Sequence, residues 1–170
     1  MDDMPDRIKR WVTAARIFTP VELPLSFLGS SLGKLDVELI SKDTTLAKQA
    51  CKIEGGGMII AFGEELTLSY LWVLGAYEFV RVLSQRAREE EPFFKTQFPQ
   101  VDRVKRNFER LRIPLAKLEP AKRHKKTDFR IPFPIFDHKR QSTAWAVGSG
   151  VCISRRELAD ELLDLLEGKA

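Results

Sequence analysis

The sequence predicts a mainly α (α+β) fold: one compact helical domain spanning residues 1–170, built around a central apolar helix and carrying a small β-hairpin. A chain of 170 residues suffices for one domain and is short for two. With 44% apolar and 31% charged residues it resembles an ordinary soluble globular protein. Residues 66–83 are apolar on nearly every side, which is expected of a helix in the middle of a core.

The first half of the chain is predicted to contain two or three helices. Ile8, Trp11 and Ala15 recur at helical spacing, so a helix is expected near 6–17, ending before Pro20. The stretch 25–53 has mixed spacing. Its Asp43-Thr44-Thr45 sequence can cap a helix that runs to about residue 53, with a helical or irregular segment before it.

The central helix is predicted over 64–88, with breaks on both sides. Gly55-Gly56-Gly57 predicts a loop, and Met58–Phe62 is a β-branched and aromatic run that indicates a short strand. Pro92 stops the helix, and residues 93–99 are expected to form a linker with aromatic anchors.

A further helix is predicted near 101–112. Val101, Val104, Phe108 and Leu111 form its inward stripe, and Pro114 is expected to end it or to begin a new turn. Lys105 and Glu109, four residues apart on this helix, are spaced to form an ion pair.

The C-terminal part is predicted to combine extended segments with one more helix. Phe129, Ile131, Phe133 and Ile135 alternate as along an edge strand that buries one face, and Pro132 and Pro134 exclude a central strand. Residues 143–153 indicate a β-hairpin turning at Gly148-Ser149-Gly150. Ser154 and Glu157 have the spacing of a capping box, so a helix is expected over 155–167.

The charge is strongly polarised. Residues 103–140 hold thirteen Lys or Arg against four Asp or Glu, which gives +9, whereas the rest of the chain carries −5. Such a segment favours a polyanionic partner, RNA or single-stranded DNA, because no groove-reading helix motif is evident. The predicted nucleic-acid-binding residues are Arg103, Arg106, Arg110, Lys122, Arg123, Lys125, Lys126, Arg130, Lys139 and Arg140. The alternative interpretation is a solvent-exposed basic face that balances the negative charge of the acidic residues on the terminal helix.

The rings of residues 129–136 have two interpretations. They could stack on unpaired bases, but their alternation already assigns them a buried face, so the core is the favoured interpretation.

The two histidines, His124 and His138, are the candidate catalytic residues. An imidazole next to cations can cleave RNA without metal, and Arg123, Lys125 and Lys126 adjoin His124. A helical domain with such a histidine resembles the HEPN ribonucleases in general class only. These are small and often dimeric helical bundles with an Arg followed four to six residues later by a His. The chain departs from that signature, since Lys117 replaces the Arg at the outer spacing from His124, and Arg130 lies one residue too far from His138.

The leading hypothesis is therefore a cytoplasmic, prokaryotic nucleic-acid-binding protein without cofactor or metal, and an enzyme is the less favoured option. The alternatives are a metal-independent ribonuclease of HEPN type and an oligomeric accessory subunit that binds an acidic partner. The sequence contains no P-loop, dinucleotide motif, nucleophile elbow or paired-cysteine zinc motif, and the loose His124–Asp128 spacing is a weak metal signal among so many cations. Because charged residues lie near the end of the apolar helix, we expect it to be a buried helix and not a membrane span.

Overall fold

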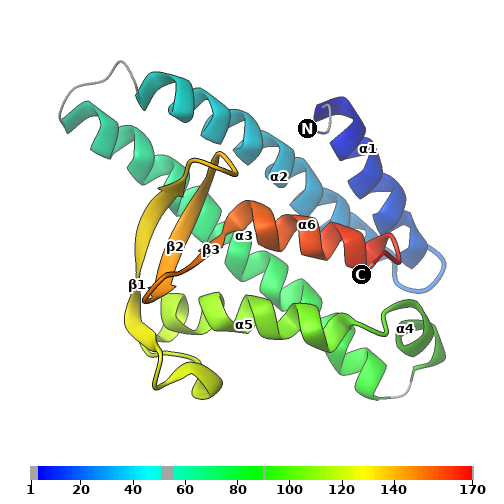
Figure 1. Cartoon of the computed structure of the whole chain (residues 1–170). Coiled ribbons are helices and arrows are strands. Elements are labelled where there is room, and N and C mark those ends of the chain that lie inside the picture. The colour runs from blue at the N-terminus through cyan, green and yellow to red at the C-terminus, as the bar shows by residue number, and fades with distance from the viewer. Residues whose placement is uncertain (1–3, 51–55, 90, 170) are drawn as a thin grey trace.

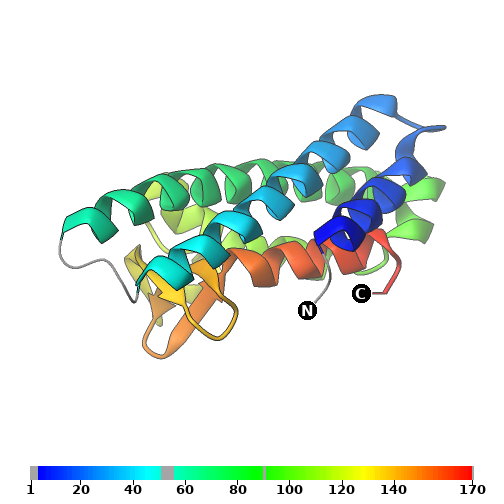
Figure 2. The ribbon, with the colours of Figure 1, turned by 90° about the horizontal axis from the view of Figure 1, so that it is seen from above.

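The computed structural model describes residues 4–50, 56–89 and 91–169, and it is mostly helical with one small sheet (Figure 1). Figure 2 shows the sheet at one end of the helical layers. The helices are α1 (Met4–Ala15), α2 (Leu23–Ala50), α3 (Gly56–Arg88), α4 (Pro92–Gln97), α5 (Val101–Lys117) and α6 (Arg155–Leu166), with 3-10 turns η1 (Arg16–Phe18) and η2 (Lys122–His124). The strands are β1 (Asp128–Asp137), β2 (Ser142–Gly148) and β3 (Val151–Ser154).

The predicted central helix is confirmed as the long apolar helix α3, which packs against α2 along one side and α5 along another. Val73, Phe79 and Leu83 are fully buried, and the indole Nε1 of Trp72 donates to the carbonyl oxygen of Leu32 on α2 at 2.9 Å. The helix is less enclosed than its apolar composition predicts, because the side of α3 that carries Leu71 faces solvent.

Within the described part of the chain, one helical segment, Phe62–Arg88, is long and apolar enough to cross a membrane by length and composition. Its most apolar window has a mean hydropathy of 1.3, and 44% of that window is buried inside the protein. The core helix of a soluble protein passes the same test, so this feature alone is weak evidence for a span.

Two expectations for the first half are wrong. Asp43 does not cap a helix but lies buried in the middle of α2, which runs unbroken from Leu23 to Ala50, because its carboxylate is held by partners from β2 and α6. The strand expected over Met58–Phe62 is instead part of α3, since a short apolar run does not by itself distinguish a strand from a helix. Gly56 and Gly57 begin that helix, and Gly55 lies outside the described residues.

The segment after α3 is anchored by aromatic residues, as predicted, although it forms the short helix α4. Phe94 and Phe98 are buried and stack on Phe18, with ring centroids 6.3 and 5.4 Å away. The inward stripe of α5 is confirmed, but Pro114 does not end that helix. Pro114 lies buried in the last turn, where the lost backbone hydrogen bond is offset by packing, and α5 continues to Lys117.

The sheet has the antiparallel order β1-β2-β3, so the predicted hairpin is confirmed and β1 is an edge strand, as its prolines require. Trp145 and Val147 of β2 point into the core. On the other face Phe133 lies opposite Ala146, which lies opposite Cys152. Because partners directly opposite one another share a face, this outer face carries the Phe133 side chain.

The buried face predicted for β1 is wrong for three of its four residues, whereas Ile135 is half-buried. The exposed fractions of Phe129, Ile131 and Phe133 are 47%, 61% and 68%. These residues occupy alternate positions in the sequence of the strand, but the pairing of β1 with β2 is irregular between Asp128 and Phe133, and no helix covers this part of the sheet (Figures 1 and 2).

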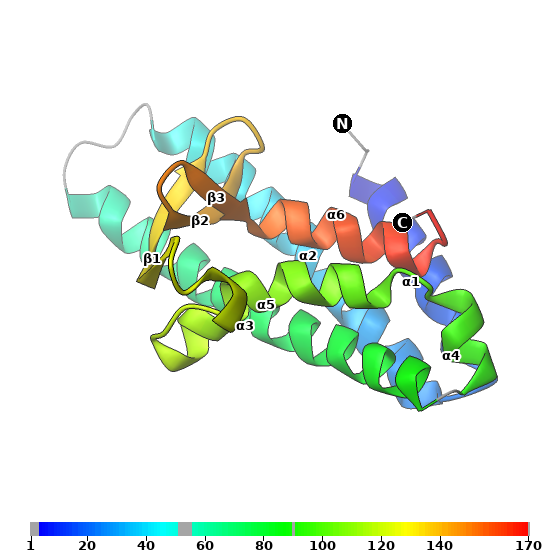
Figure 3. The same cartoon turned by 60° about the horizontal axis from the view of Figure 1, so that its bottom comes forward.

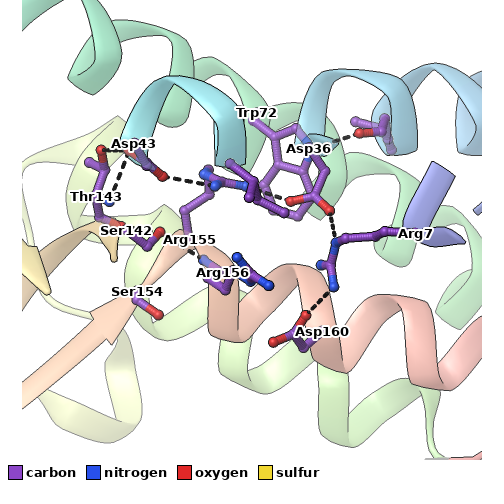
Figure 4. A network of polar contacts seen from close by, with 12 residues as sticks. Arg7, Asp36, Asp43, Trp72, Ser142, Thr143, Ser154, Arg155, Arg156 and Asp160 are labelled. Atoms are coloured by element: carbon purple, nitrogen blue, oxygen red, sulfur yellow. Dashed lines mark hydrogen bonds and ion pairs between the residues drawn. The ribbon is translucent and has the colours of Figure 1, made fainter. Parts of the chain in front are cut away.

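A buried ion network joins α1, α2, β2 and α6 (Figure 4). The guanidinium of Arg155 bridges two fully buried carboxylates, with its nitrogens 2.6 Å from Asp36 Oδ1 and 2.9 Å from Asp43 Oδ2. The second oxygen of Asp36 accepts from Arg7 Nε at 2.7 Å, and Asp43 accepts from the backbone N–H and hydroxyl of Thr143. The acids that neutralise Arg155 thus both come from α2.

The first prediction compares two leucines of α3. Leu83→Ala removes a fully buried side chain and should lower the free energy of unfolding by about 2 to 5 kcal/mol. Leu71→Ala, at a position that is 53% exposed, should change it by less than about 0.5 kcal/mol. Chemical denaturation measures both, and equal losses would contradict the assignment of the buried side of α3.

The second prediction compares two neighbouring arginines. Arg155→Met leaves Asp36 and Asp43 buried without their shared cation, so it should lower the free energy of unfolding by about 3 to 5 kcal/mol. Arg156→Met, one residue further, should be nearly neutral or slightly stabilising, because the Arg156 side chain forms no ion pair with any described residue and opposes the dipole of α6. Similar urea midpoints for the two variants would contradict the role assigned to the network.

Candidate nucleic-acid interface

The thirteen cations of residues 103–140 divide into a paired and an unpaired group. Four form ion pairs with carboxylates: Lys105 with Glu109 as predicted, Arg110 with Asp128, Arg112 with Glu78, and Arg140 with Asp137 and Glu157. The other nine are exposed, and within the described residues none forms an ion pair: Arg103, Arg106, Lys117, Lys122, Arg123, Lys125, Lys126, Arg130 and Lys139. Most of the predicted charge is therefore available to a ligand.

A cleft of about 590 Å³ lies between α5 and the segment that leads through η2. Arg106, Arg110 and Lys117 line it from α5, while Lys122, Arg123 and His124 line it from the other side. Figure 3 shows this segment between the end of α5 and the start of β1. The fold thus brings together cations of the predicted site that are up to about twenty residues apart in the sequence.

Arg110 fixes this cleft to the sheet and is not free to bind a ligand. Its Nε and a terminal nitrogen each lie 2.9 Å from one oxygen of Asp128, the first residue of β1. These hydrogen bonds hold the pKa of the Asp128 carboxyl below its ordinary value, although burial opposes the shift, and a hydrogen bond from Thr127 adds to it. Because Asp128 stays ionised, the bidentate pair ties the start of β1 to α5.

Strand β1 adds exposed rings to these charges. Lys125 and Lys126 precede the strand, and Arg130 is exposed between Phe129 and Ile131. With Phe133, the strand therefore presents two aromatic rings and one isoleucine beside cations that have no acidic partner in the described part of the chain. The sequence pattern favours a place for these rings in the core, because alternation shows that one face is distinct and not whether another element covers it.

The two histidines lie at opposite ends of β1. His124 lines the cleft beside α5, whereas His138 follows the last residue of the strand and packs edge-on against Phe136, with ring centroids 5.3 Å apart. A ten-residue strand is about 30 Å long, so the two imidazoles cannot act on one phosphate. Lys139 and Arg140 lie at the His138 end, separate from the other predicted cations.

Three features of the site were missed in the sequence. They are the exposure of Phe129 and Phe133, the contribution of Lys117 to the cleft, and the division of the basic segment between two ends of one strand. Among the described residues, no group of three or more His, Cys, Asp or Glu side chains is placed to hold a metal ion.

No protein-family model, curated protein or solved structure matches this chain, so its function is argued from its own residues.

Proposed function

We propose that the protein binds single-stranded nucleic acid, RNA or DNA, along strand β1. Bases would stack on Phe129 and Phe133, and phosphates would lie against the cations at the start of the strand, among them Lys125, Lys126 and Arg130. This combination of aromatic rings and a basic track is how single strands are bound without strong sequence preference.

The observation that carries the proposal is the exposed row on β1. Soluble proteins rarely leave several large apolar side chains exposed together unless the surface binds something. Phe133 at 68% and Ile131 at 61% exposure are the most exposed large apolar side chains of the sheet. An apolar protein partner would explain the exposed rings but not the lysines beside them, because lysine is depleted at protein–protein interfaces.

A single strand fits this surface better than a duplex. The bases of a duplex are already stacked on one another, whereas unpaired bases can lie flat on exposed rings. An extended strand about 30 Å long also offers a path for several nucleotides, in the range of about 4 to 16 typical of single-strand binding folds.

The third prediction concerns the cations. Replacing Arg123, Lys125 and Lys126 by Gln should weaken binding of a single-stranded oligonucleotide, because each lost phosphate contact removes counterion release. The slope of log K against log salt should flatten by up to about 0.7 per contact, or about 2 in total. The matched control replaces Lys9, Arg16 and Lys34, which are exposed on the helical side and form no ion pair with the residues that the structure describes, and it should leave the slope unchanged. Fluorescence anisotropy measures both, and a wild-type protein that does not bind at about 50 mM salt would overturn the proposal.

The fourth prediction concerns the rings. Phe129→Ala with Phe133→Ala should weaken binding by about 1 to 3 kcal/mol per stacked base and leave the salt slope unchanged. Stability should change by less than about 0.5 kcal/mol per site, since both rings are exposed. Phe27→Ala on α2 is the control, because Phe27 is 66% exposed against 68% for Phe133. If Phe27→Ala weakens binding as much as the β1 variant does, the rings of β1 are not the platform.

Cleavage of the bound strand is the alternative that His124 favours, since it lines a cleft with Arg123 and Lys122. A lone imidazole could take the 2′-hydroxyl proton, but no second histidine is near enough to protonate the leaving oxygen.

The fifth prediction is accordingly that labelled RNA incubated with the protein in EDTA is bound and stays intact. Metal-independent cleavage that disappears in His124→Ala would replace this account with the ribonuclease hypothesis. Cleavage that is unchanged in His124→Ala would remove His124 from any mechanism.

A second candidate function, protein–protein interaction, is favoured by a different surface. Val21, Leu23, Phe27 and Leu28, around the start of α2, are between 42% and 66% exposed. This cluster lies at the opposite end of the molecule from the sheet (Figures 1 and 2). If it joins two copies of the chain, sedimentation of wild-type protein should show a dimer that Phe27→Ala dissociates, with nucleic-acid binding per chain unchanged.

A further inference from the structure

A second basic cleft, about 620 Å³ in volume, lies at the end of β1 that is remote from η2. It is formed where the turn between β1 and β2 meets the C-terminal part of α2 and the first turn of α6. Its cations come from all three places: Lys48 from α2, Lys139 and Arg140 from the turn, and Arg156 from α6. Two of these four lie outside the basic segment of the sequence.

The positive charge of this cleft is largely uncompensated. Among its lining residues Asp160 is the sole carboxylate, and one of its oxygens is engaged at 2.6 Å by Arg7. Arg140 has only long contacts, 3.5 Å to Asp137 and 3.8 Å to Glu157, and its side chain is 44% exposed. Within the described residues, Lys48, Lys139 and Arg156 form no ion pair.

Arg156 is in an unfavourable place without an anion. It is the second residue of α6, a twelve-residue helix, where the positive end of the helix dipole disfavours a cation by about 0.3 to 1 kcal/mol. Its neighbour Arg155 is neutralised by Asp36 and Asp43, but the Arg156 side chain is directed to the cleft. A bound anion would remove this cost.

The hydrogen-bonding groups of the cleft favour an anion over a cation. Thr44 and Thr45 donate their hydroxyl hydrogens to helix carbonyls at 2.8 and 3.0 Å, so they contribute no free donor. The charged donors of the cleft are the guanidinium and ammonium groups, whose preferred partners are carboxylates and phosphates, and the Ser41 hydroxyl and Gln141 amide also line it. The arginines can provide bidentate contacts to a phosphate, and the lysines can provide point charges.

We propose that this cleft is a phosphate-binding site in which Arg156 and Lys48 hold the phosphate group. The volume is in the range of about 300 to 1,000 Å³ found for small-ligand pockets, so it leaves room for an organic part of nucleotide size. The phosphate comes either from a free phosphorylated small molecule or from the terminal phosphate of a strand bound along β1. The site itself does not rest on nucleic-acid binding, because its volume and its cations are independent of the rings of β1.

Isothermal titration calorimetry of the full chain tests the site with three probes: inorganic phosphate, adenosine monophosphate, and a short single strand with or without a 5′-phosphate. Wild-type protein should bind phosphate saturably at one site per chain. Arg156→Gln with Lys48→Gln should weaken that binding tenfold or more, since a hydrogen bond to a charged group contributes about 1.5 to 3 kcal/mol. Arg16→Gln with Lys34→Gln, which removes the same two residue types elsewhere, should leave it unchanged.

The probes identify the source of the phosphate. Tighter binding of adenosine monophosphate than of inorganic phosphate supports a free small ligand, and a preference for the 5′-phosphorylated strand that the cleft variant loses supports a strand end. Absence of saturable binding to every probe, or equal binding by the cleft variant with its fold intact by circular dichroism, would overturn the proposal. The variant of Arg123, Lys125 and Lys126 should still bind phosphate, so failure of the strand-binding proposal and failure of this one are distinguishable.

Discussion

The arrangement of the domain depends on one buried cation. Arg155 stands at the junction between β3 and α6 and bridges Asp36 and Asp43 on α2, and through Asp36 it is linked to Arg7 on α1 (Figure 4). Buried charges are costly unless they are paired and hydrogen-bonded. The bridge from Arg155 to Asp36 and Asp43 therefore allows few other orientations of α6 relative to α2. Thr143 extends the network from Asp43 into β2, which fixes the sheet to the helical layers.

This attachment determines which face of the sheet is left free. Thr143, Trp145 and Val147 are buried on the side that the network and the core helices hold, whereas the opposite side is buried at Ala144 and left exposed at Phe133. At the start of β1 the Arg110–Asp128 pair adds a second tether, which places the exposed rings beside the cations of α5 and η2. The proposed interface is thus a strand that is tethered at its start by the Arg110–Asp128 pair and paired with β2 from Phe133 to Asp137.

Local signals in the sequence predicted the parts of the fold that depend on local interactions. Ser154 accepts the backbone N–H of Glu157 at 3.0 Å, as the capping box indicates, and the apolar stripe of α5 is buried as its spacing predicts. Asp43 could not be placed in this way, because its partners lie 100 and 112 residues away. The same limit applies to the site: the charge of residues 103–140 is visible in the sequence, but the exposure of Phe129 and Phe133 depends on which elements pack over the sheet.

The central claim is that unpaired bases lie on the outer face of β1. Ultraviolet crosslinking of the protein to a saturating single-stranded oligonucleotide, followed by mass spectrometry of the digested complex, tests it most directly because a ring stacked on a base can be crosslinked to it. The account predicts that the crosslinked residues fall within 128–137, at Phe129 and Phe133. Crosslinks confined to the apolar cluster around the start of α2, or none at all in a saturated complex, would contradict it.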